Sequence, residues 1–165
     1  MGFRPIVTLK YSDELVKGKN LNNELQVGDN VNYSALEYQN WKVLSIENEN
    51  NTVDIISGGV VKNIMLYGEQ DFDSFEEILQ NEVDKYKVGD NVISARALEY
   101  SDLTNLNKIS DRVNAKYWIN AKKQYNKKSV DETSSPYSGN AFYNVGIMYY
   151  NNDNASIEKN GFHFI

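Results

Sequence analysis

Residues 41–57 read WKVLSIENENNTVDIIS, with an apolar run on each side of an asparagine-rich loop. In both runs, WKVLSI and TVDIIS, apolar and β-branched residues alternate with polar ones, which is the pattern of strands that bury one face. The loop ENENN between them has the composition of a hairpin connection. This stretch therefore predicts a β-hairpin, and with it antiparallel pairing in the sheet.

A repeated sequence motif occurs once before and once after this hairpin. Residues 27–40 read VGDNVNYSALEYQN and residues 88–102 read VGDNVISARALEYSD, so VGDNV and ALEY recur in the same order. A duplication would carry one structure after both copies, yet the first leads into the hairpin and the second into DLTNLNKISDRV, whose spacing is helical. Repeat arrays also need about three units to stack. We therefore expect the two copies to share sequence without sharing architecture, and we expect no second binding site.

Three further segments have the composition of strands. The first covers residues 3–9, and Pro5 within it predicts an edge position because proline cannot donate a ladder hydrogen bond. FYNVGIMYY at residues 142–150 alternates with a period of two, and NGFHFI at residues 160–165 predicts a short final strand.

Helical spacing is clearest over residues 75–86, where Ser74 and Glu77 predict a capping box. A second helix is expected to begin near Ser101, and a third is expected over residues 110–125. Together these elements predict one α+β domain spanning residues 1–165, with a mixed or antiparallel sheet and two to three helices.

Composition excludes several classes of site. The 165 residues include no cysteine and one histidine, His163, so disulfides, thiolate chemistry and His-rich metal sites are not expected. The net charge of −6 opposes nucleic-acid binding, which depends on neutralising phosphates. No signal peptide or bilayer-spanning run is evident. We therefore expect a soluble chain, cytoplasmic as synthesised, that acts in a virion or in the host cytoplasm without membrane or cofactor.

Several phrases together resemble a known family. VGDNVNY, WKVLSI and VDIIS, then FEEILQNEVDKY with SARALEYSDLTNL, and finally Tyr117-Trp118, are similar to motifs of a prophage- and surface-associated protein family of low-GC Gram-positive bacteria. That family carries a C-type-lectin-like domain, so the resemblance implies a C-type-lectin-like fold and a phage or surface role.

One motif stands at the opposite end from its place in that family. GFRPIVTLK covers residues 2–10, whereas the family's closing strand reads GFRPVVSL. First and last strands pair in C-type-lectin-like domains, so the resemblance implies a permuted closing strand. Residues 3–9 are then expected beside the strand that ends at Ile165.

The strongest binding signal lies in residues 134–154, which are rich in Tyr, Asn, Ser and Gly. Recognition loops use this combination, because tyrosine offers a rigid amphipathic anchor and the small polar residues offer adaptable hydrogen bonds. The alternative is that the strand tyrosines are ordinary residues of an exposed sheet face. The candidate binding residues, with the first two as anchors, are Trp118, Tyr137, Tyr143, Tyr149, Tyr150, Asn151, Asn152 and Asp153.

The sequence thus predicts a non-catalytic binding protein of phage or prophage origin that engages a host protein or glycan. One alternative is an intracellular anti-defence inhibitor that occludes a host effector. Another is a small hydrolase using carboxylates such as Asp71, Asp73 or Asp153. Calcium at Asp71, Asp73 and Glu76, or at residues 151–154, is disfavoured because acidic helix starts and Asx turns are common for other reasons. No metal site is predicted.

Overall fold

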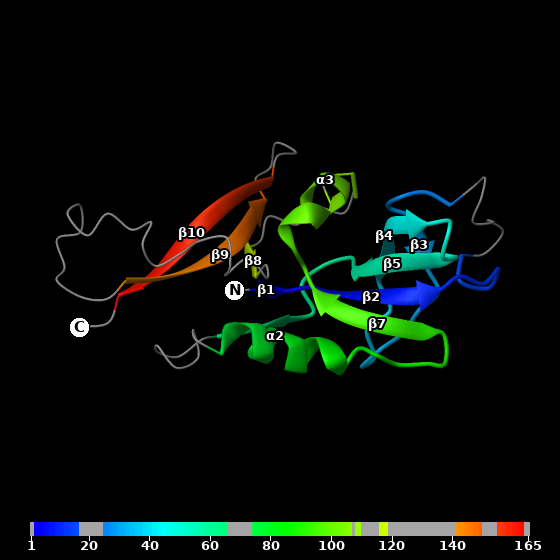
Figure 1. Ribbon diagram of the computed structural model, residues 1–165, viewed down its shortest axis with the longest axis horizontal. Helices are drawn as coiled ribbons and strands as arrows, with labels where there is room; N and C mark the ends of the chain where they lie inside the picture. Colours follow the sequence, from blue (N-terminus) through cyan, green and yellow to red (C-terminus); the bar gives the residue numbers. More distant parts are fainter. Residues whose placement is uncertain are drawn as a thin grey trace.

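The computed structural model describes residues 2–16, 25–65, 74–106, 108–109, 116–118, 141–149 and 155–163. These residues form two five-stranded sheets and two α-helices (Figure 1). The first sheet is antiparallel and has the order β3-β4-β5-β2-β7, with bounds Asn30–Val31, Trp41–Glu47, Thr52–Ser57, Pro5–Lys10 and Val92–Ala97.

The second sheet is mixed and has the order β10-β9-β8-β1-β6, with bounds Ala155–His163, Ala141–Tyr149, Lys116–Trp118, Gly2–Phe3 and Lys62–Asn63. Its neighbours pair antiparallel except β8 and β1, which are parallel with Gly2 opposite Tyr117. Only Arg4 separates β1 from β2, so the N-terminal segment contributes to both sheets. Arg4 is buried, and its Nε donates to the carbonyl oxygen of Ser57 at 3.0 Å.

The predicted hairpin of β4 and β5 is confirmed, with Trp41 opposite Ser57 and Glu47 opposite Thr52. The edge position predicted from Pro5 is wrong, because β2 lies between β5 and β7. Pro5 is the first residue of β2, where a proline is tolerated even inside a sheet.

A helical segment lies on each face of the antiparallel sheet (Figure 1). Helix α2, Phe75–Asp84, buries Phe75, Leu79 and Val83. The opposite face is covered by a short 3-10 helix η1, Tyr100–Asp102, and helix α3, Leu103–Leu106. The capping box predicted at the start of α2 is wrong, because the Ser74 side chain makes no capping hydrogen bond.

Both faces of this sheet are apolar because successive strand residues point to opposite sides. On the α2 face, Val7 and Ile55 belong to the main core, which is centred on Trp41. On the other face, a second set of buried side chains lies outside that core: Ile6, Leu44, Ile56, Leu98, Leu106 and Ile109. The hairpin strands therefore carry continuous apolar runs where they cross the middle of the sheet.

The predicted α+β class, with mixed and antiparallel sheets, is confirmed. The helix predicted over residues 110–125 is wrong at its centre, where Lys116–Trp118 form β8. The expected place of residues 3–9 beside the last strand is also wrong, since β8 and β9 lie between β1 and β10. Within the described part of the chain, no helix has the length and apolar character needed to cross a membrane.

Both copies of VGDNV place their glycine at a positive φ. Gly28 has a φ of +95° and Gly89 a φ of +103°, a region that glycine enters without steric cost. Each turn leads into an edge strand of the antiparallel sheet, β3 or β7. The turns themselves differ, because the Asp29 amide donates to the Gln26 carbonyl in the first copy and the Val92 amide to the Gly89 carbonyl in the second, so the prediction that the copies share no architecture is confirmed in part for VGDNV. It is confirmed for ALEY, because Ala35 and Tyr38 close a tight turn whereas the second copy continues from β7 into η1.

Candidate functional site

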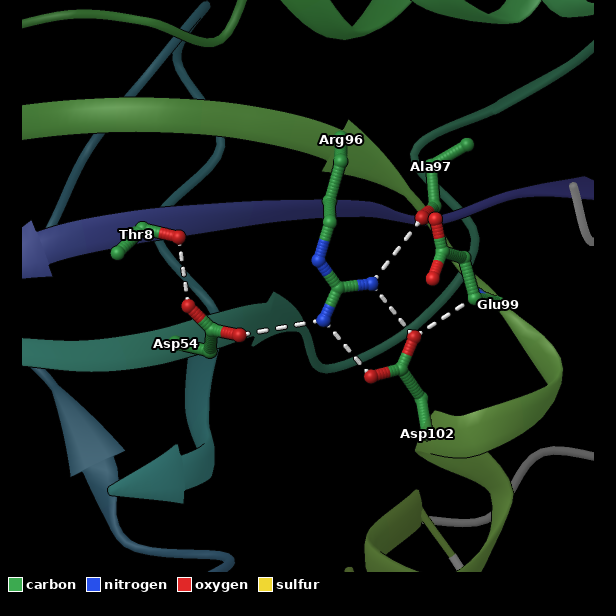
Figure 2. A network of polar contacts seen from close by, with 6 residues as sticks. All are labelled: Thr8, Asp54, Arg96, Ala97, Glu99 and Asp102. Atoms are coloured by element: carbon green, nitrogen blue, oxygen red, sulfur yellow. Dashed lines mark hydrogen bonds and ion pairs between the residues drawn. The ribbon is translucent and has the colours of Figure 1, made fainter. Parts of the chain in front are cut away.

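A polar network joins four elements, β2, β5, β7 and η1, on the α3 side of the antiparallel sheet (Figure 2). At its centre is Arg96 of β7, whose guanidinium donates to both carboxylate oxygens of Asp102 at 2.7 and 2.8 Å. The same guanidinium donates to Asp54 of β5 at 3.1 Å. Thr8 of β2 donates its hydroxyl to the other Asp54 oxygen at 2.6 Å, and the Glu99 amide donates to Asp102 at 2.8 Å.

Every carboxylate oxygen of Asp54 and Asp102 therefore accepts a hydrogen bond from the protein. Burial alone lowers the pKa of Arg96, but the hydrogen bonds and charges of Asp102 and Asp54 outweigh burial and raise this pKa above its ordinary value. The guanidinium is thus a permanent cation that fastens η1 to the sheet. A carboxylate with both oxygens engaged in this way is suited to holding structure, not to shuttling protons to a substrate.

The most unusual backbone lies in the first ALEY copy. Ala35 and Tyr38 exchange backbone hydrogen bonds of 3.1 and 2.9 Å around Leu36 and Glu37. Both central residues have positive φ, +49° and +64°, as in a type I′ turn. Such turns favour Asn and Gly, and each ordinary residue in the left-handed region costs roughly 1 kcal/mol or more. Leu36 is nevertheless 59% exposed, so packing does not offset this cost.

Hydrogen bonds and aromatic contacts hold this turn against the core. The Gly59 amide donates to the Tyr38 hydroxyl at 3.0 Å, and the indole of Trp41 donates to the Tyr38 carbonyl at 3.1 Å. The Tyr38 and Trp41 rings meet edge-on, with centroids 5.7 Å apart. A Cβ on Gly58 would lie 2.4 Å from Asn40 Nδ2, so this close approach requires glycine. The turn therefore has a rigid base.

The same aromatic cluster joins the two repeated phrases. Tyr33, from the first copy, accepts a hydrogen bond from the Val88 amide of the second at 3.1 Å and donates to the Tyr86 carbonyl. Its ring packs edge-on against Trp41, with centroids 5.1 Å apart. Burial raises the pKa of Tyr33 despite the Val88 hydrogen bond, and burial also raises the pKa of Tyr86. Both phenols stay neutral at ordinary pH and act as packing groups.

The structure places only some of the predicted binding residues. Trp118 lies on β8 opposite Gly146 of β9, and Tyr143 and Tyr149 lie on β9. The side chains of Trp118, Tyr143 and Tyr149 lie outside the described part of the structure, so their roles as binding residues stay predictions. Outside the described residues lie Tyr137, Tyr150, Asn151, Asn152 and Asp153.

Most of the carboxylates suggested for hydrolysis or calcium binding lie outside the described residues. Asp71 and Asp73 lie outside the described residues, and Glu76 is in the first turn of α2. In the part of the chain that is described, no group of three His, Cys, Asp or Glu side chains is placed to hold a metal ion. No family model, curated protein or solved structure matches the chain.

Sequence reasoning missed two features, the Arg96 network and the turn at Leu36 and Glu37. The network joins Asp54 to Arg96 and to Thr8, which are 42 and 46 positions away in the sequence, and no local spacing signals such contacts. The turn has none of the Gly, Asn or Asp residues that mark a tight turn in sequence. The only indication in the sequence is the apolar residue Leu36 within SALEY, and this residue is equally compatible with a strand or a helix.

Proposed function

We propose that the chain is a non-catalytic recognition protein of phage or prophage origin, which binds a host protein or glycan through its mixed sheet. The observation that carries this proposal is the register of that sheet. Strands β9 and β10 pair over nine residues, whereas β8 pairs only with residues 146–148 of β9. Among the described residues, 141–145 and 159–163 therefore form a two-stranded arm, which we call the recognition arm.

The recognition arm points away from α2 and the antiparallel sheet (Figure 1). A two-stranded ribbon is marginally stable without further packing, so an arm of this kind is well suited to gain order from a partner. Its sequence, with Tyr143 and the asparagines Asn144 and Asn160, has the amphipathic and hydrogen-bonding groups that recognition surfaces use. A tyrosine ring is also a side chain that can stack on a sugar ring.

The hydrolase alternative receives less support. The carboxylates of Asp54 and Asp102 share one guanidinium and are fully hydrogen-bonded, which makes this pair unsuited to acid and base roles. A C-type-lectin-like fold would favour a glycan partner, but the strand pairing expected of that fold is absent between β1 and β10. The proposed binding role therefore rests on the recognition arm, whereas the proposed phage or prophage origin rests on the sequence resemblance.

The test is capture of partners by the full chain, with a glycan array and a host-lysate pull-down run in parallel. We expect one of the two to retain a discrete ligand, and Tyr143→Ala with Tyr149→Ala to weaken its binding at least tenfold, about 1.4 kcal/mol. An intracellular effector as the captured ligand would identify the chain as an anti-defence inhibitor.

The matched control is Asn48→Ala in the exposed loop between β4 and β5, which is expected to bind as the parent chain does. Undiminished binding by the tyrosine variants, with unchanged thermal unfolding, would contradict the proposal. Retention of no ligand in either assay would also count against it.

A further inference from the structure

The exposed turn at Leu36 and Glu37 has no explanation in folding alone. Leu36 is 59% exposed and Glu37 is exposed, so neither side chain gains from burial. Both residues adopt positive φ, a conformation for which Asn-Gly is better suited. Strained, non-glycine backbone of this kind persists where the surroundings impose it, and it concentrates at functional positions.

The base of the turn is fixed before any partner arrives. Tyr38 is held through its hydroxyl by Gly59 and through its carbonyl by Trp41, which is 1% exposed. A backbone held in this way loses little conformational entropy when the turn is buried in a complex. Leu36 therefore has the properties of a pre-organised anchor.

We propose that the turn at Leu36 and Glu37 is a protein-docking point, separate from the recognition arm. Its partner is a protein that presents an apolar pocket with a lysine or arginine at the rim. The pocket follows from Leu36, whose side chain has no ring for stacking on a sugar and no group for hydrogen bonding. The rim cation follows from Glu37, which places a negative charge beside the anchor.

A lipid surface fits this turn less well than a protein does. An exposed leucine can enter the membrane interface, but binding to anionic lipid depends on basic residues. Glu37 and the net charge of −6 both oppose that attraction. Lipid binding is therefore an outcome of the test and not the proposal.

The first experiment measures folding. Replacing Leu36→Asn together with Glu37→Gly is expected to raise the urea midpoint of unfolding, because the new residues adopt the same turn with less strain. A lowered midpoint would show that Leu36 and Glu37 serve the fold, and would overturn the proposal.

The second experiment measures docking. A photo-crosslinking amino acid at position 36 is expected to capture one protein from host-cell extract, and that protein is then purified for affinity measurements. Leu36→Ala is expected to weaken binding at least tenfold, and Glu37→Lys to weaken binding and reverse its dependence on salt. The matched control, Ile93→Ala on β7, changes an aliphatic side chain of similar exposure (55%) and is expected to bind normally.

Three results would overturn the proposal: no crosslinked protein, equal binding by Leu36→Ala, or Leu36-dependent flotation with vesicles of phosphatidylcholine and phosphatidylglycerol. The proposal does not rest on the recognition arm, because the variants of Tyr143 and Tyr149 change neither Leu36 nor Glu37. Failure of the docking proposal is therefore distinguishable from failure of the proposed function of the recognition arm.

Discussion

Arg96 shows how one side chain can fasten three elements of a small domain. Its guanidinium joins β7 to Asp54 on β5 and to Asp102 on η1, and the Asp102 side chain is only 9% exposed. The ion pair by itself contributes modestly, because the Arg96 side chain remains 31% exposed and solvent screens its charge. The larger effect of removing Arg96 is that the half-buried carboxylates lose their partner.

We therefore expect Arg96→Ala to lower the free energy of unfolding by about 2 kcal/mol, measured by urea denaturation at pH 7. Lys62→Ala is the control, since it breaks an ion pair with Glu82 in which the lysine is 44% exposed. That change is expected to lower stability by less than about 1 kcal/mol. Equal losses in the two variants would contradict the structural role given to Arg96.

Glu82 is expected to make a pH-dependent contribution to the free energy of unfolding. Burial raises its pKa, but hydrogen bonds and charges from Lys62 and Lys85 outweigh burial, so the folded pKa lies below the ordinary value of 4.5. A lowered folded pKa means that the stabilisation is present above the unfolded pKa and is lost as the pH falls through the folded pKa. The stability difference between the parent chain and Glu82→Gln is therefore expected to be larger at pH 7 than at pH 2, by urea denaturation at each pH. A difference that grows toward pH 2 would contradict this assignment.

At the scale of elements, the alternation in residues 41–57 was sufficient to predict β4 and β5, because both strands and their turn are local in sequence. The prediction of secondary structure failed where pairing between strands distant in sequence determines the structure. Val113 and Tyr117 have helical spacing, yet Lys116–Trp118 pair with β1 and β9 as β8. Local pattern is overridden when neighbouring strands offer partners, since strand preference depends mainly on context. The edge position predicted from Pro5 is wrong for the same reason. Strand β7, which is distant in sequence, pairs with β2 and places Ala97 opposite Pro5.

The candidate sites were less predictable than the strands. Composition indicated the Tyr- and Asn-rich segment, but the pairing of β8 with β9, which brings Trp118 opposite Gly146, is non-local and could not be predicted from composition. The turn at Leu36 and Glu37 was not predictable, because its residues are not those that favour positive φ.

The glycines of the two VGDNV copies lead to a prediction at the scale of elements. Gly28→Ala and Gly89→Ala are each expected to lower the free energy of unfolding by about 1–2 kcal/mol, because an L-residue is strained at their positive φ. Gly59→Ala is the control: a Cβ there would lie 3.8 Å from the Tyr38 hydroxyl, an ordinary contact, and its φ lies outside the left-handed region. Chemical denaturation of the three variants tests this, and a larger loss for Gly59→Ala than for the other two would refute the account.

At the scale of the whole molecule, the two sheets have different properties. The antiparallel sheet is covered by α2 on one face and by η1 and α3 on the other, and its strands are joined by the Arg96 network (Figures 1 and 2). The mixed sheet ends in the recognition arm, which pairs with no third strand among the described residues. A covered sheet that carries a projecting ribbon is an arrangement suited to binding, and this contrast underlies the proposed function.

The most direct test of that function is hydrogen–deuterium exchange of the full chain with and without its captured ligand. The account predicts that ligand slows amide exchange mainly in residues 141–145 and 159–163, while exchange in β2, β4 and β5 is already slow and changes little. Slowed exchange confined to the residues around Arg96 and Asp102, with none in the recognition arm, would contradict the account.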